Sequence, residues 1–389
     1  MRAMDPTCYA RRMRRCTGPS VTTAGHSRLR AALPVHWQRI RSEANSLRFV
    51  FWGLYCTSRW QSLLRNTSDE GSEVTVTYSH GGYLMHRKVK IILNPMADMG
   101  NAWRVARDLR SITEQHGGVD WSGTVYPGHA IELAKQAGEQ GYDMVIAMGG
   151  DGTVHEVVNG LMKVPGGKRP ILGVVPVGSG NDFAHSIGVP KNSSEALLRA
   201  LDGTPSAIDL GLMTDSDGRR EYFDNTLGIG FGAIVTIRSH QLPLLRGFLM
   251  YLTAVIQTII VDHNPITMQI ETDTEKWEQK IIYLILCNGP REGGGFLVAP
   301  EAQIDDGILH YAMITDVSRP MMFRIVPEVM KGTHGRFKQV KMGTCKKFTI
   351  TSDRPLYIHA DGEIFTGPGT DLRKVSFEIV PNALKVVRG

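Results

Sequence analysis

YDMVIAMGGDGTVHEVVNGLM, residues 142–162, is the stretch of this chain that decides its fold. Its first part, residues 142–148, is short and apolar, as is typical of a buried strand, and residues 153–162 have the apolar spacing of an amphipathic helix. The glycines between them therefore occupy a strand-to-helix turn. Such a turn can bind phosphate, because glycines let the backbone approach an anion and the first helical N–H groups point toward it.

Asp151 places a carboxylate in this turn, where phosphate oxygens would lie. Carboxylate and phosphate repel each other unless a divalent cation lies between them, or unless the carboxylate accepts a proton from an attacking hydroxyl. The structural alternative for Asp151 is an N-cap of the following helix. We expect Asp151 to be functional, and Thr153 with the amides of Gly150 and Gly152 to contact phosphate.

A second glycine-rich turn, residues 178–182, follows the apolar strand 171–175 and begins another helical stretch. In an open α/β sheet both turns would lie at the carboxyl ends of strands, where ligands bind. A single turn of this kind is often ordinary turn chemistry. Two of them on neighbouring strand–helix units favour a nucleotide site.

Short apolar strands alternate with helical segments from Lys88 to about Gly211, which predicts a doubly wound parallel sheet covered on both faces by helices. Strands are expected at 89–93, 123–126, 144–147 and 171–175, and helices at 102–115, 130–140, 153–162, 182–187 and 195–201. The pattern after Gly211 is β-rich with turn residues between the segments, and it predicts an antiparallel β-sandwich domain. Its strands are expected at 223–227, 266–271, 280–287, 308–314, 347–351, 356–359 and 374–380.

The most apolar stretch of the second domain is residues 247–261, which are too few to span a bilayer unaided. We expect a core helix with Leu249, Leu252, Ile256 and Ile259 on its buried face. The alternative is that part of it lines a cleft for lipid chains or rests on a membrane surface.

Four blocks of the chain resemble the diacylglycerol kinase catalytic-domain family of lipid kinases, in particular its soluble bacterial members, with sphingosine kinases as relatives. They are IILNP (91–95), GGDGTVHEVVNGL (149–161), PVGSGNDFA (176–184), and APEAQIDDGIL (299–309) with HADGE (359–363). The resemblance runs from Lys88 to Gly389, roughly three quarters of the chain. GGDGT alone also occurs in NAD kinases and phosphofructokinases, so the later blocks give the resemblance its specificity.

The resemblance implies a kinase that uses ATP and Mg²⁺, with diacylglycerol or a related lipid alcohol as acceptor and the cleft between the two domains as active site. The nucleotide-binding residues it implies are Asn94, Thr124, Gly149, Gly150, Asp151, Gly152, Thr153, Val154, His155, Glu156 and Ser179. Glu363 matches the block of the family's proposed general base, and we assign it that role with Asp151 at the metal; the reverse assignment stays open. Glu156 either orients this site or lies on an exposed helix face.

Asp306 lies in Asp305-Asp306-Gly307, which by itself would indicate a hairpin turn. The resemblance makes Asp306, with the backbone carbonyls of Gln303 and Ile308, the ligand set of a structural Mg²⁺ near the cleft.

One departure from the family pattern follows Asn94. The family commonly has a short Ser/Gly-Lys segment there, whereas residues 96–101 of this chain contain no basic residue.

The net charge of +6 is concentrated in residues 1–87, which hold 13 Arg, no Lys and 5 acidic residues. The remaining 31 basic and 33 acidic residues leave a balance of −2, which does not favour nucleic-acid binding. We expect residues 1–87 to be a disordered or non-native extension, with the natural start at Met85. The alternatives are a flexible tail that contacts anionic lipid through its arginines, or a targeting segment with part of a membrane anchor at residues 49–56.

The domains are therefore expected at 88–211, for the ATP-binding α/β domain to which 381–389 return, and at 212–380, for the sandwich. Five cysteines without a CxxC pair indicate neither a disulfide framework nor a zinc module, and they favour the cytoplasm.

We expect a lipid substrate at the membrane surface, no transmembrane span and no nucleic-acid partner, and a homodimer stays open. An NAD-kinase-like or other small-molecule kinase, and a catalytically silent lipid-binding relative, are the alternative functions.

Overall fold

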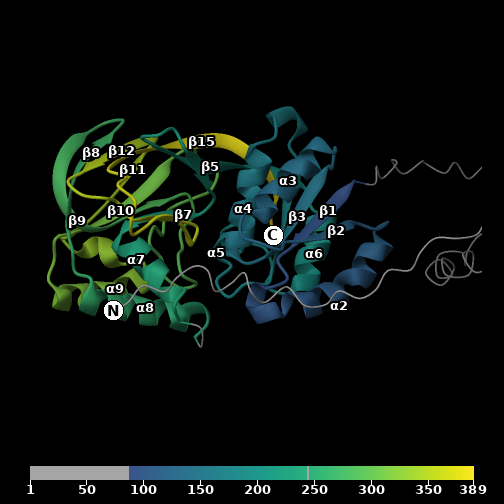
Figure 1. Ribbon diagram of the computed structural model, residues 1–389, viewed down its shortest axis with the longest axis horizontal. Helices are drawn as coiled ribbons and strands as arrows, with labels where there is room; N and C mark the ends of the chain where they lie inside the picture. Colours follow the sequence, from purple (N-terminus) through teal and green to yellow (C-terminus); the bar gives the residue numbers. More distant parts are fainter. Residues whose placement is uncertain (1–86, 243–244) are drawn as a thin grey trace, which may run out of the picture. The chain divides into compact units, whose positions relative to one another are not determined.

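The computed structural model describes residues 87–242 and 245–389. The predictions for the N-terminal extension, including the start at Met85 and the apolar run at 49–56, lie outside the described residues. The described strands form one sheet of 15 strands, in which an α/β half and a β-rich half are continuous (Figure 1). The predicted combination of an α/β domain followed by a β-sandwich domain is confirmed.

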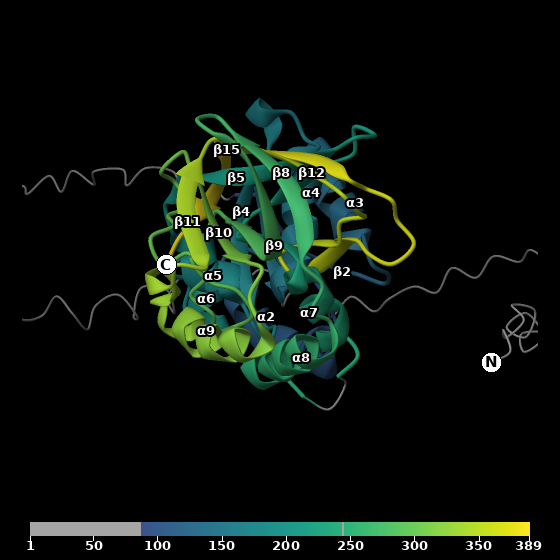
Figure 2. The same ribbon diagram turned by 90° about the vertical axis from the view of Figure 1, so that its left-hand side faces the viewer.

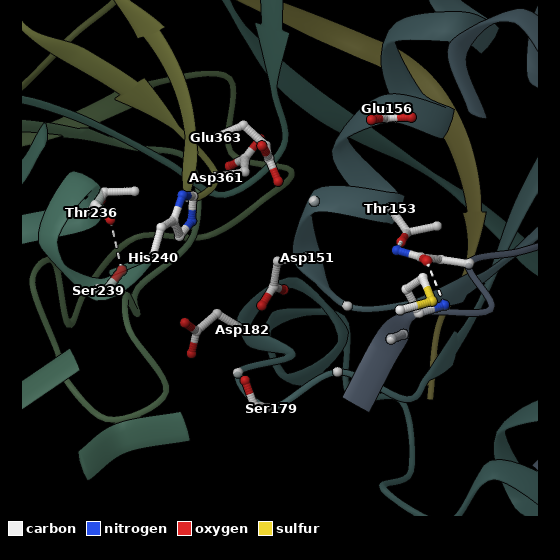
Figure 3. A pocket seen from close by; sticks show the side chains of 18 of the residues that line it. Asp151, Thr153, Glu156, Ser179, Asp182, Thr236, Ser239, His240, Asp361 and Glu363 are labelled. Carbon is white, nitrogen blue, oxygen red and sulfur yellow. Dashed lines mark hydrogen bonds between the residues drawn. The ribbon is translucent and has the colours of Figure 1, made fainter. Parts of the chain in front are cut away.

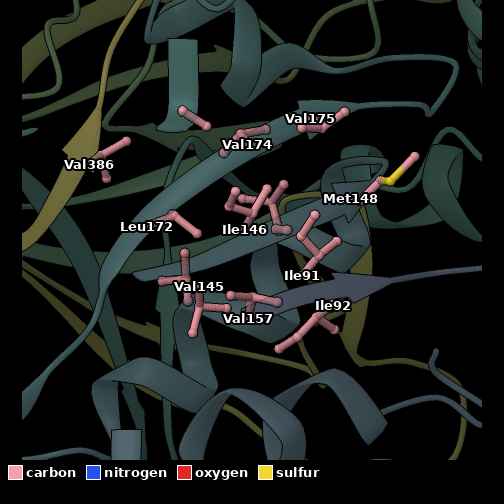
Figure 4. Close-up of a cluster of buried hydrophobic side chains, with 14 of the residues drawn as sticks. Ile91, Ile92, Val145, Ile146, Met148, Val157, Leu172, Val174, Val175 and Val386 are labelled. Carbon is pink, nitrogen blue, oxygen red and sulfur yellow. The ribbon is translucent and has the colours of Figure 1, made fainter. Parts of the chain in front are cut away.

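The α/β half contains four parallel strands in the order β4-β3-β1-β2. The strands are β1 (Val89–Leu93), β2 (Asp120–Gly123), β3 (Met144–Gly149) and β4 (Ile171–Pro176). The helices are α2 (Ala102–Gln115), α3 (His129–Glu139), α4 (Asp151–Met162), α5 (Asp182–Ser186) and α6 (Ser193–Asp202). Two short 3₁₀ turns are η3 (Ala97–Gly100) and η4 (Gly166–Lys168). Every residue of β3 is buried, as expected for a central strand covered on both faces. Ile91, Ile146 and Leu172 form the middle of this core (Figure 4).

Most predicted elements of this half coincide with observed ones, and the predicted ranges for β1 and α2 have the observed bounds. The strand predicted at 123–126 is wrong, because β2 ends at Gly123 and the following residues form a loop. β2 pairs only with β1, so it is an edge strand, and none of its residues is fully buried. An edge strand of this kind does not have the apolar run by which the central strands were recognised.

The β-rich half is antiparallel in all its described strand pairs. Its strands are β6 (Arg220–Phe223), β7 (Thr226–Gly230), β8 (Ile266–Thr272), β9 (Lys276–Cys287), β10 (Leu309–Thr315), β11 (Val340–Cys345), β12 (Lys347–Ser352), β13 (Ile358–Ala360) and β14 (Glu363–Thr366). Alternate residues of β9 face two different cores: Leu284 packs among strand residues, whereas Ile285 packs against helices. Those helices are α7 (Phe231–Ser239), α8 (Gly247–Val261) and α9 (Arg319–Lys331), followed by η5 (His334–Arg336).

Two predictions for this half are wrong. The single strand expected at 223–227 is two strands, because β6 ends at Phe223 and β7 begins at Thr226. Helix α8 has the predicted bounds, and Ile259 is buried as predicted, but Leu249 and Ile256 of the predicted buried face are 63% and 40% exposed. The buried residues of α8 are Ala254, Val255, Thr258 and Ile259. None of the described helices is long and apolar enough to cross a bilayer.

Two long strands, β5 (Pro205–Asp215) and β15 (Lys374–Val387), connect the halves. They pair with each other in antiparallel fashion, with an irregularity in β15 between Val380 and Leu384. On one side of it Phe377 packs in the sandwich core, and on the other Leu384 and Val386 pack in the α/β core. Val386 also pairs with Leu172 of β4 in parallel. The same strand pair therefore belongs to both halves, and it fixes the walls of the space between them.

The contact between α3 and α4 gives a stability test. An added Cβ at Gly160 of α4 would lie 2.4 Å from the carbonyl oxygen of Ile131 and 2.7 Å from Cβ of Ala134. We expect Gly160→Ala to lower the free energy of unfolding by about 1 to 3 kcal/mol, because overpacking against backbone outweighs the better helix propensity of alanine. Denaturant unfolding measures this. Gly167→Ala, whose Cβ would have no neighbour within 4 Å, is the matched control, and equal stability of the two variants would contradict this packing.

Candidate active site

A cavity of about 610 Å³ lies between the α/β half and the β-rich half (Figure 3). Its walls come from both glycine-rich turns, the loops after β1 and β2, helices α7 and α8, and the turn between β13 and β14. Seven of its lining residues carry carboxyl groups: Asp98, Asp151, Glu156, Asp182, Glu292, Asp361 and Glu363. No Lys or Arg is among the described residues that line it. The cavity is therefore strongly acidic.

The first glycine-rich turn has the predicted geometry, with β3 ending at Gly149 and α4 beginning at Asp151. Gly150 occupies the N-cap position, and no side chain caps this helix, so Asp151 does not take the structural role that we considered for it. The side chain of Thr153 accepts a hydrogen bond from Nδ2 of Asn94 at 3.2 Å, which ties the turn to the end of β1. The first amides of α4 thus remain available to an anion.

The two turns touch each other through glycines. An added Cβ at Gly178 would lie 2.4 Å from Cα of Gly150, and one at Gly150 would lie 3.2 Å from Cα of Gly178. Only residues without side chains permit this approach. The two turns therefore form one continuous backbone surface at the carboxyl ends of β3 and β4.

Asp151 and Asp182 form a pair of carboxylates on this surface (Figure 3). Oδ1 of Asp151 accepts a hydrogen bond from the amide of Phe183 at 3.2 Å, and Oδ2 of Asp182 accepts one from the amide of Gly294 at 2.8 Å. Burial, together with the charge of Asp151, raises the pKa of Asp182 to about 7. Burial also raises the pKa of Asp151. Such a pair is stable only with a bound proton or cation between the groups.

Asp361, in the turn between β13 and β14, is the centre of a buried network. Its Oδ1 accepts hydrogen bonds from the amides of Asn225 and Thr226, and its Oδ2 from the amide of Asp224, each at 3.0 Å. Nδ1 of His155 lies 2.9 Å from the same Oδ2. Asp361 has φ of 50°, a left-handed conformation that a non-glycine residue adopts at a cost. The four hydrogen bonds hold this strained turn in place.

His155 joins this turn to the helix that begins at the first glycine-rich turn, because it belongs to α4. Its other ring nitrogen, Nε2, lies 3.0 Å from Oε1 of Glu221. Burial opposes a charge on this imidazole, but the hydrogen bonds with Asp361 and Glu221 outweigh it, and the pKa of His155 is well above its ordinary value. His155 is therefore an imidazolium between two carboxylates. It does not line the cavity.

Glu363 lies two residues after Asp361 and reaches the first glycine-rich turn. An added Cβ at Gly152 would lie 2.1 Å from Oε1 of Glu363, so the carboxylate occupies the space that this glycine leaves open. The side chain of Glu363 is exposed to solvent, and it lines the cavity. Burial of the carboxylate raises the pKa of Glu363, and the nearby His155 and His240 oppose the shift.

Nine of the residues predicted from the sequence line the cavity together. They are Asn94, Thr124, Gly150, Asp151, Gly152, Thr153, Glu156, Ser179 and Glu363. Gly149, Val154 and His155 do not: Gly149 is the buried end of β3, and the side chains of Val154 and His155 are buried. Glu156 accepts hydrogen bonds from the amides of Gly128 at 2.7 Å and Ala130 at 3.0 Å, so it caps α3.

The residues predicted for a structural Mg²⁺, Gln303, Asp306 and Ile308, lie outside the cavity. Oδ1 of Asp306 accepts a hydrogen bond from the amide of Ile308 at 3.1 Å, and its Oδ2 is 3.5 Å from Nε2 of His310. Both carboxylate and carbonyl oxygens suit Mg²⁺, and water can reach the exposed Gln303 and Asp306. Within residues 87–242 and 245–389, no group of three or more His, Cys, Asp or Glu side chains is arranged to hold a metal ion.

Helix α7 was not predicted from the sequence, so the part of the cavity wall that α7 and α8 form was not expected. Thr236, Ser239 and His240 line the cavity from α7 and its end, and Tyr251 lines it from α8. The Asp182 carboxylate could have been found, since it begins a helix after a glycine-rich turn as Asp151 does.

A second, apolar cavity of about 50 Å³ adjoins the first and shares Tyr251 and Glu292 with it. The other lining residues are Phe231, Gly232, Val235, Val255, Tyr283, Phe296, Val298, Ile314, Met322, Ile325, Val326 and Val329. Glu292 is 7% exposed, and its Oε2 accepts a hydrogen bond from the Tyr283 hydroxyl at 2.6 Å. The polar, acidic cavity thus borders directly on an apolar one.

Comparisons with known proteins agree with this architecture. Residues 88–213 match the family model of the diacylglycerol kinase catalytic domain, and residues 225–388 match that of the YegS C-terminal NAD kinase beta sandwich-like domain. The chain is 38% identical over 199 residues to a protein of Chromohalobacter salexigens named as a YegS-like lipid kinase, a match that covers 50% of this chain and 60% of that protein.

Two other comparisons extend over more of the relative. The chain is 30% identical over 307 residues to a protein of Mycobacterium tuberculosis named diacylglycerol kinase, covering 77% of this chain and 95% of the relative. A solved structure, described as a diacylglycerol kinase from Bacillus anthracis str. Sterne, has the same fold, with a TM-score of 0.59 and 20% identity over 78% of this chain and 97% of that one. The resemblance inferred from the sequence is confirmed: the chain belongs to the diacylglycerol kinase catalytic-domain family of lipid kinases.

Proposed function

We propose that this protein transfers the γ-phosphoryl group of ATP, with Mg²⁺, to the hydroxyl of diacylglycerol or a related lipid alcohol. The observation that carries the proposal is the position of Glu363, whose carboxylate fills the space over Gly152. A group able to accept a proton from an alcohol therefore lies against the turn that would hold the phosphates. This is the arrangement that phosphoryl transfer to a hydroxyl requires.

The ATP phosphates are assigned to the first amides of α4 and to the backbone of the second turn, since both present N–H groups without side-chain obstruction. Asp151 and Asp182 would hold Mg²⁺ through carboxylate oxygens, and the bound ion would neutralise charge on the phosphates. The pKa of Asp182, which burial and the charge of Asp151 raise to about 7, supports a cation at this place, because a cation would stabilise the buried carboxylate and offset the repulsion from Asp151.

In the transfer step, the acceptor oxygen forms a bond to the γ-phosphorus while the bond from that phosphorus to the β,γ-bridging oxygen breaks, and ADP leaves. Glu363 takes the proton of the acceptor hydroxyl. Its raised pKa suits this role, because a carboxylate of higher pKa is a stronger base near neutral pH. Asp361 does not touch the reacting atoms in this scheme, and its turn positions Glu363.

The lipid class is supported by the apolar cavity behind Tyr251 and Glu292. An acceptor with an alkyl chain would place its hydroxyl in the polar cavity and begin its chain in the apolar one. The relatives that are named lipid kinases and diacylglycerol kinases support the same class. Phosphate incorporation from labelled ATP, compared between diacylglycerol and NAD as acceptors, tests it, and transfer to NAD alone would refute it.

Two isosteric variants separate the roles of the carboxylates. Asp151→Asn and Glu363→Gln should each lower turnover by about 100-fold or more. Affinity for Mg²⁺–ATP should fall in Asp151→Asn, which loses a metal ligand, and persist in Glu363→Gln, which acts only as the hydroxyl attacks. Calorimetric titration measures the affinities, with the exposed Asp108→Asn as control. If the affinity for Mg²⁺–ATP instead persists in Asp151→Asn and falls in Glu363→Gln, Asp151 would be the base and Glu363 the metal ligand.

The His155 imidazolium predicts a pH-dependent stability. Because its folded-state pKa is raised, its contribution is complete below the unfolded pKa of about 6.5 and is lost as pH rises through the folded-state value. His155→Asn should cost about 3 to 5 kcal/mol at low pH, since it leaves Asp361 and Glu221 without their cation. Denaturant unfolding as a function of pH measures both effects. If wild type and His155→Asn lose stability in parallel above pH 6.5, while the matched His116→Asn behaves as wild type, the charge assignment is wrong.

The metal site at Asp306 stays a prediction, and it concerns stability rather than chemistry. Asp306→Ala would remove the only charged ligand of the proposed Mg²⁺ site, so it should lower the melting temperature and abolish its dependence on Mg²⁺. The neighbouring Asp305→Ala, which loses only an exposed ion pair with Arg388, is the control. If the melting temperature of the wild type is the same with and without a chelator of Mg²⁺, the proposed metal site is contradicted.

A further inference from the structure

Helix α8 exposes an apolar stripe to solvent. Leu249, Ile256 and Ile260 are 63%, 40% and 58% exposed, and their spacing of seven and four residues places them on one face of the helix. Val261 at the end of the helix is 61% exposed. The 15 residues of α8 include no charged side chain. In a water-soluble domain, an uncharged helix with its apolar residues outward needs a partner.

Helix α9 lies beside α8 at the edge of the β-rich half, as both views show (Figures 1 and 2). Nε of Arg319 donates a hydrogen bond to the carbonyl of Ile259 at 3.1 Å, which joins the two helices. Phe323 of α9 is 43% exposed and extends the apolar surface. We refer to Leu249, Ile256, Ile260, Val261 and Phe323 together as the α8–α9 face.

Helix α9 and the segment that follows it carry a cluster of positive charge. Residues 319–341 contain six Lys or Arg and one acidic residue, Glu328, although residues 88–389 as a whole have a balance of −2. Glu328 pairs with Arg336 at 2.8 Å. Arg324, Lys331 and Lys338 are exposed and form no ion pair with any described residue. The positive charge is therefore free to attract an external anion.

The opposite side of these helices leads to the active site. Tyr251 and Val255 of α8 and Met322 and Ile325 of α9 line the apolar cavity. Gly247, the first residue of α8, lies close to the second glycine-rich turn, since an added Cβ there would be 3.2 Å from the carbonyl of Ser179. The two helices thus separate the α8–α9 face from the apolar cavity by a single layer.

We propose that the α8–α9 face docks on a membrane that contains anionic lipid. Exposed aliphatic side chains beside unpaired Lys and Arg match the acyl region and the headgroups of such a surface. A second copy fits less well, because a twofold contact would bring the same basic clusters together. This inference rests on the proposed lipid kinase function. On a membrane, the acceptor lipid would reach the apolar cavity without leaving the bilayer completely for water.

Vesicle co-sedimentation of the full chain tests the proposal. On vesicles of phosphatidylcholine with phosphatidylglycerol, Leu249→Ser/Ile260→Ser should bind about tenfold or more weakly than wild type, because two aliphatic side chains no longer enter the bilayer. The matched control is Trp103→Ser/Leu198→Ser, which removes side chains that are 61% and 40% exposed on α2 and α6. Its binding should equal that of wild type. The arginines of residues 1–87 are present in every variant, so their attraction to the vesicles cancels.

The charge contribution has its own variant. Arg324→Gln/Lys331→Gln should weaken binding to the phosphatidylglycerol vesicles by about tenfold and leave binding to pure phosphatidylcholine vesicles unchanged. Equal binding of the stripe variant and its control would overturn the proposal. So would a loss of self-association in the stripe variant with unchanged vesicle binding, which would make the face a contact between copies.

An activity measurement keeps this result apart from the proposed function. With a short-chain diacylglycerol dispersed in detergent micelles, the stripe variant should have wild-type turnover, because none of its changed residues lines either cavity. Absence of phosphoryl transfer in wild type as well would refute the proposed function and leave the vesicle comparison intact. A stripe variant that is inactive in micelles although wild type is active would overturn the docking role, since the stripe would then serve the catalytic cavity.

Discussion

The site depends on the buried contact between His155 and Asp361, which links the α/β half to the β-rich half. A positively charged ring from α4 meets a carboxylate that also receives three backbone amides, and the partners are removed from water. A buried charge without its counter-charge is costly, so each half restricts where the other can lie. Through this contact the turn of Asp361 is held beside helix α4, to which we assign the phosphates, and Glu363 is placed at Gly152.

The acidity of the cavity fits the same arrangement. Among the residues that the structure describes, seven carboxyl groups and no Lys or Arg line a space that in the proposed function would receive a highly anionic nucleotide, so electrostatics alone would reject ATP without a cation. No described Lys or Arg of this lining replaces the basic residue that is missing after Asn94. Arg246, just before α8, instead pairs with Asp98 of that loop at 3.1 Å, with both groups partly exposed. In the proposed function, this imbalance would favour the metal-bound nucleotide over the free one.

The sequence sufficed where a local pattern determines the structure. The apolar run before Gly149 and the helical spacing after it predict the turn that places Asp151, and the same reasoning finds the second turn. It failed where a distant partner decides. His155 and Asp361 are 206 residues apart, so no spacing could indicate their contact, and we assigned His155 to the nucleotide instead. The buried face of α8 was wrong because apolar residues surround this helix, and its packing partners select which of them are covered.

The strand pair β5 and β15 has a consequence for the order in which the molecule is made. The α/β core contains Leu384 and Val386, which follow the whole sandwich in the chain. During synthesis the α/β half therefore stays incomplete, with an uncovered edge at β4, until residues that are translated some 170 positions after β5 leave the ribosome. A ribosome that stops within the sandwich would release a chain with an unfinished first domain, an exposed strand edge and a tendency to aggregate.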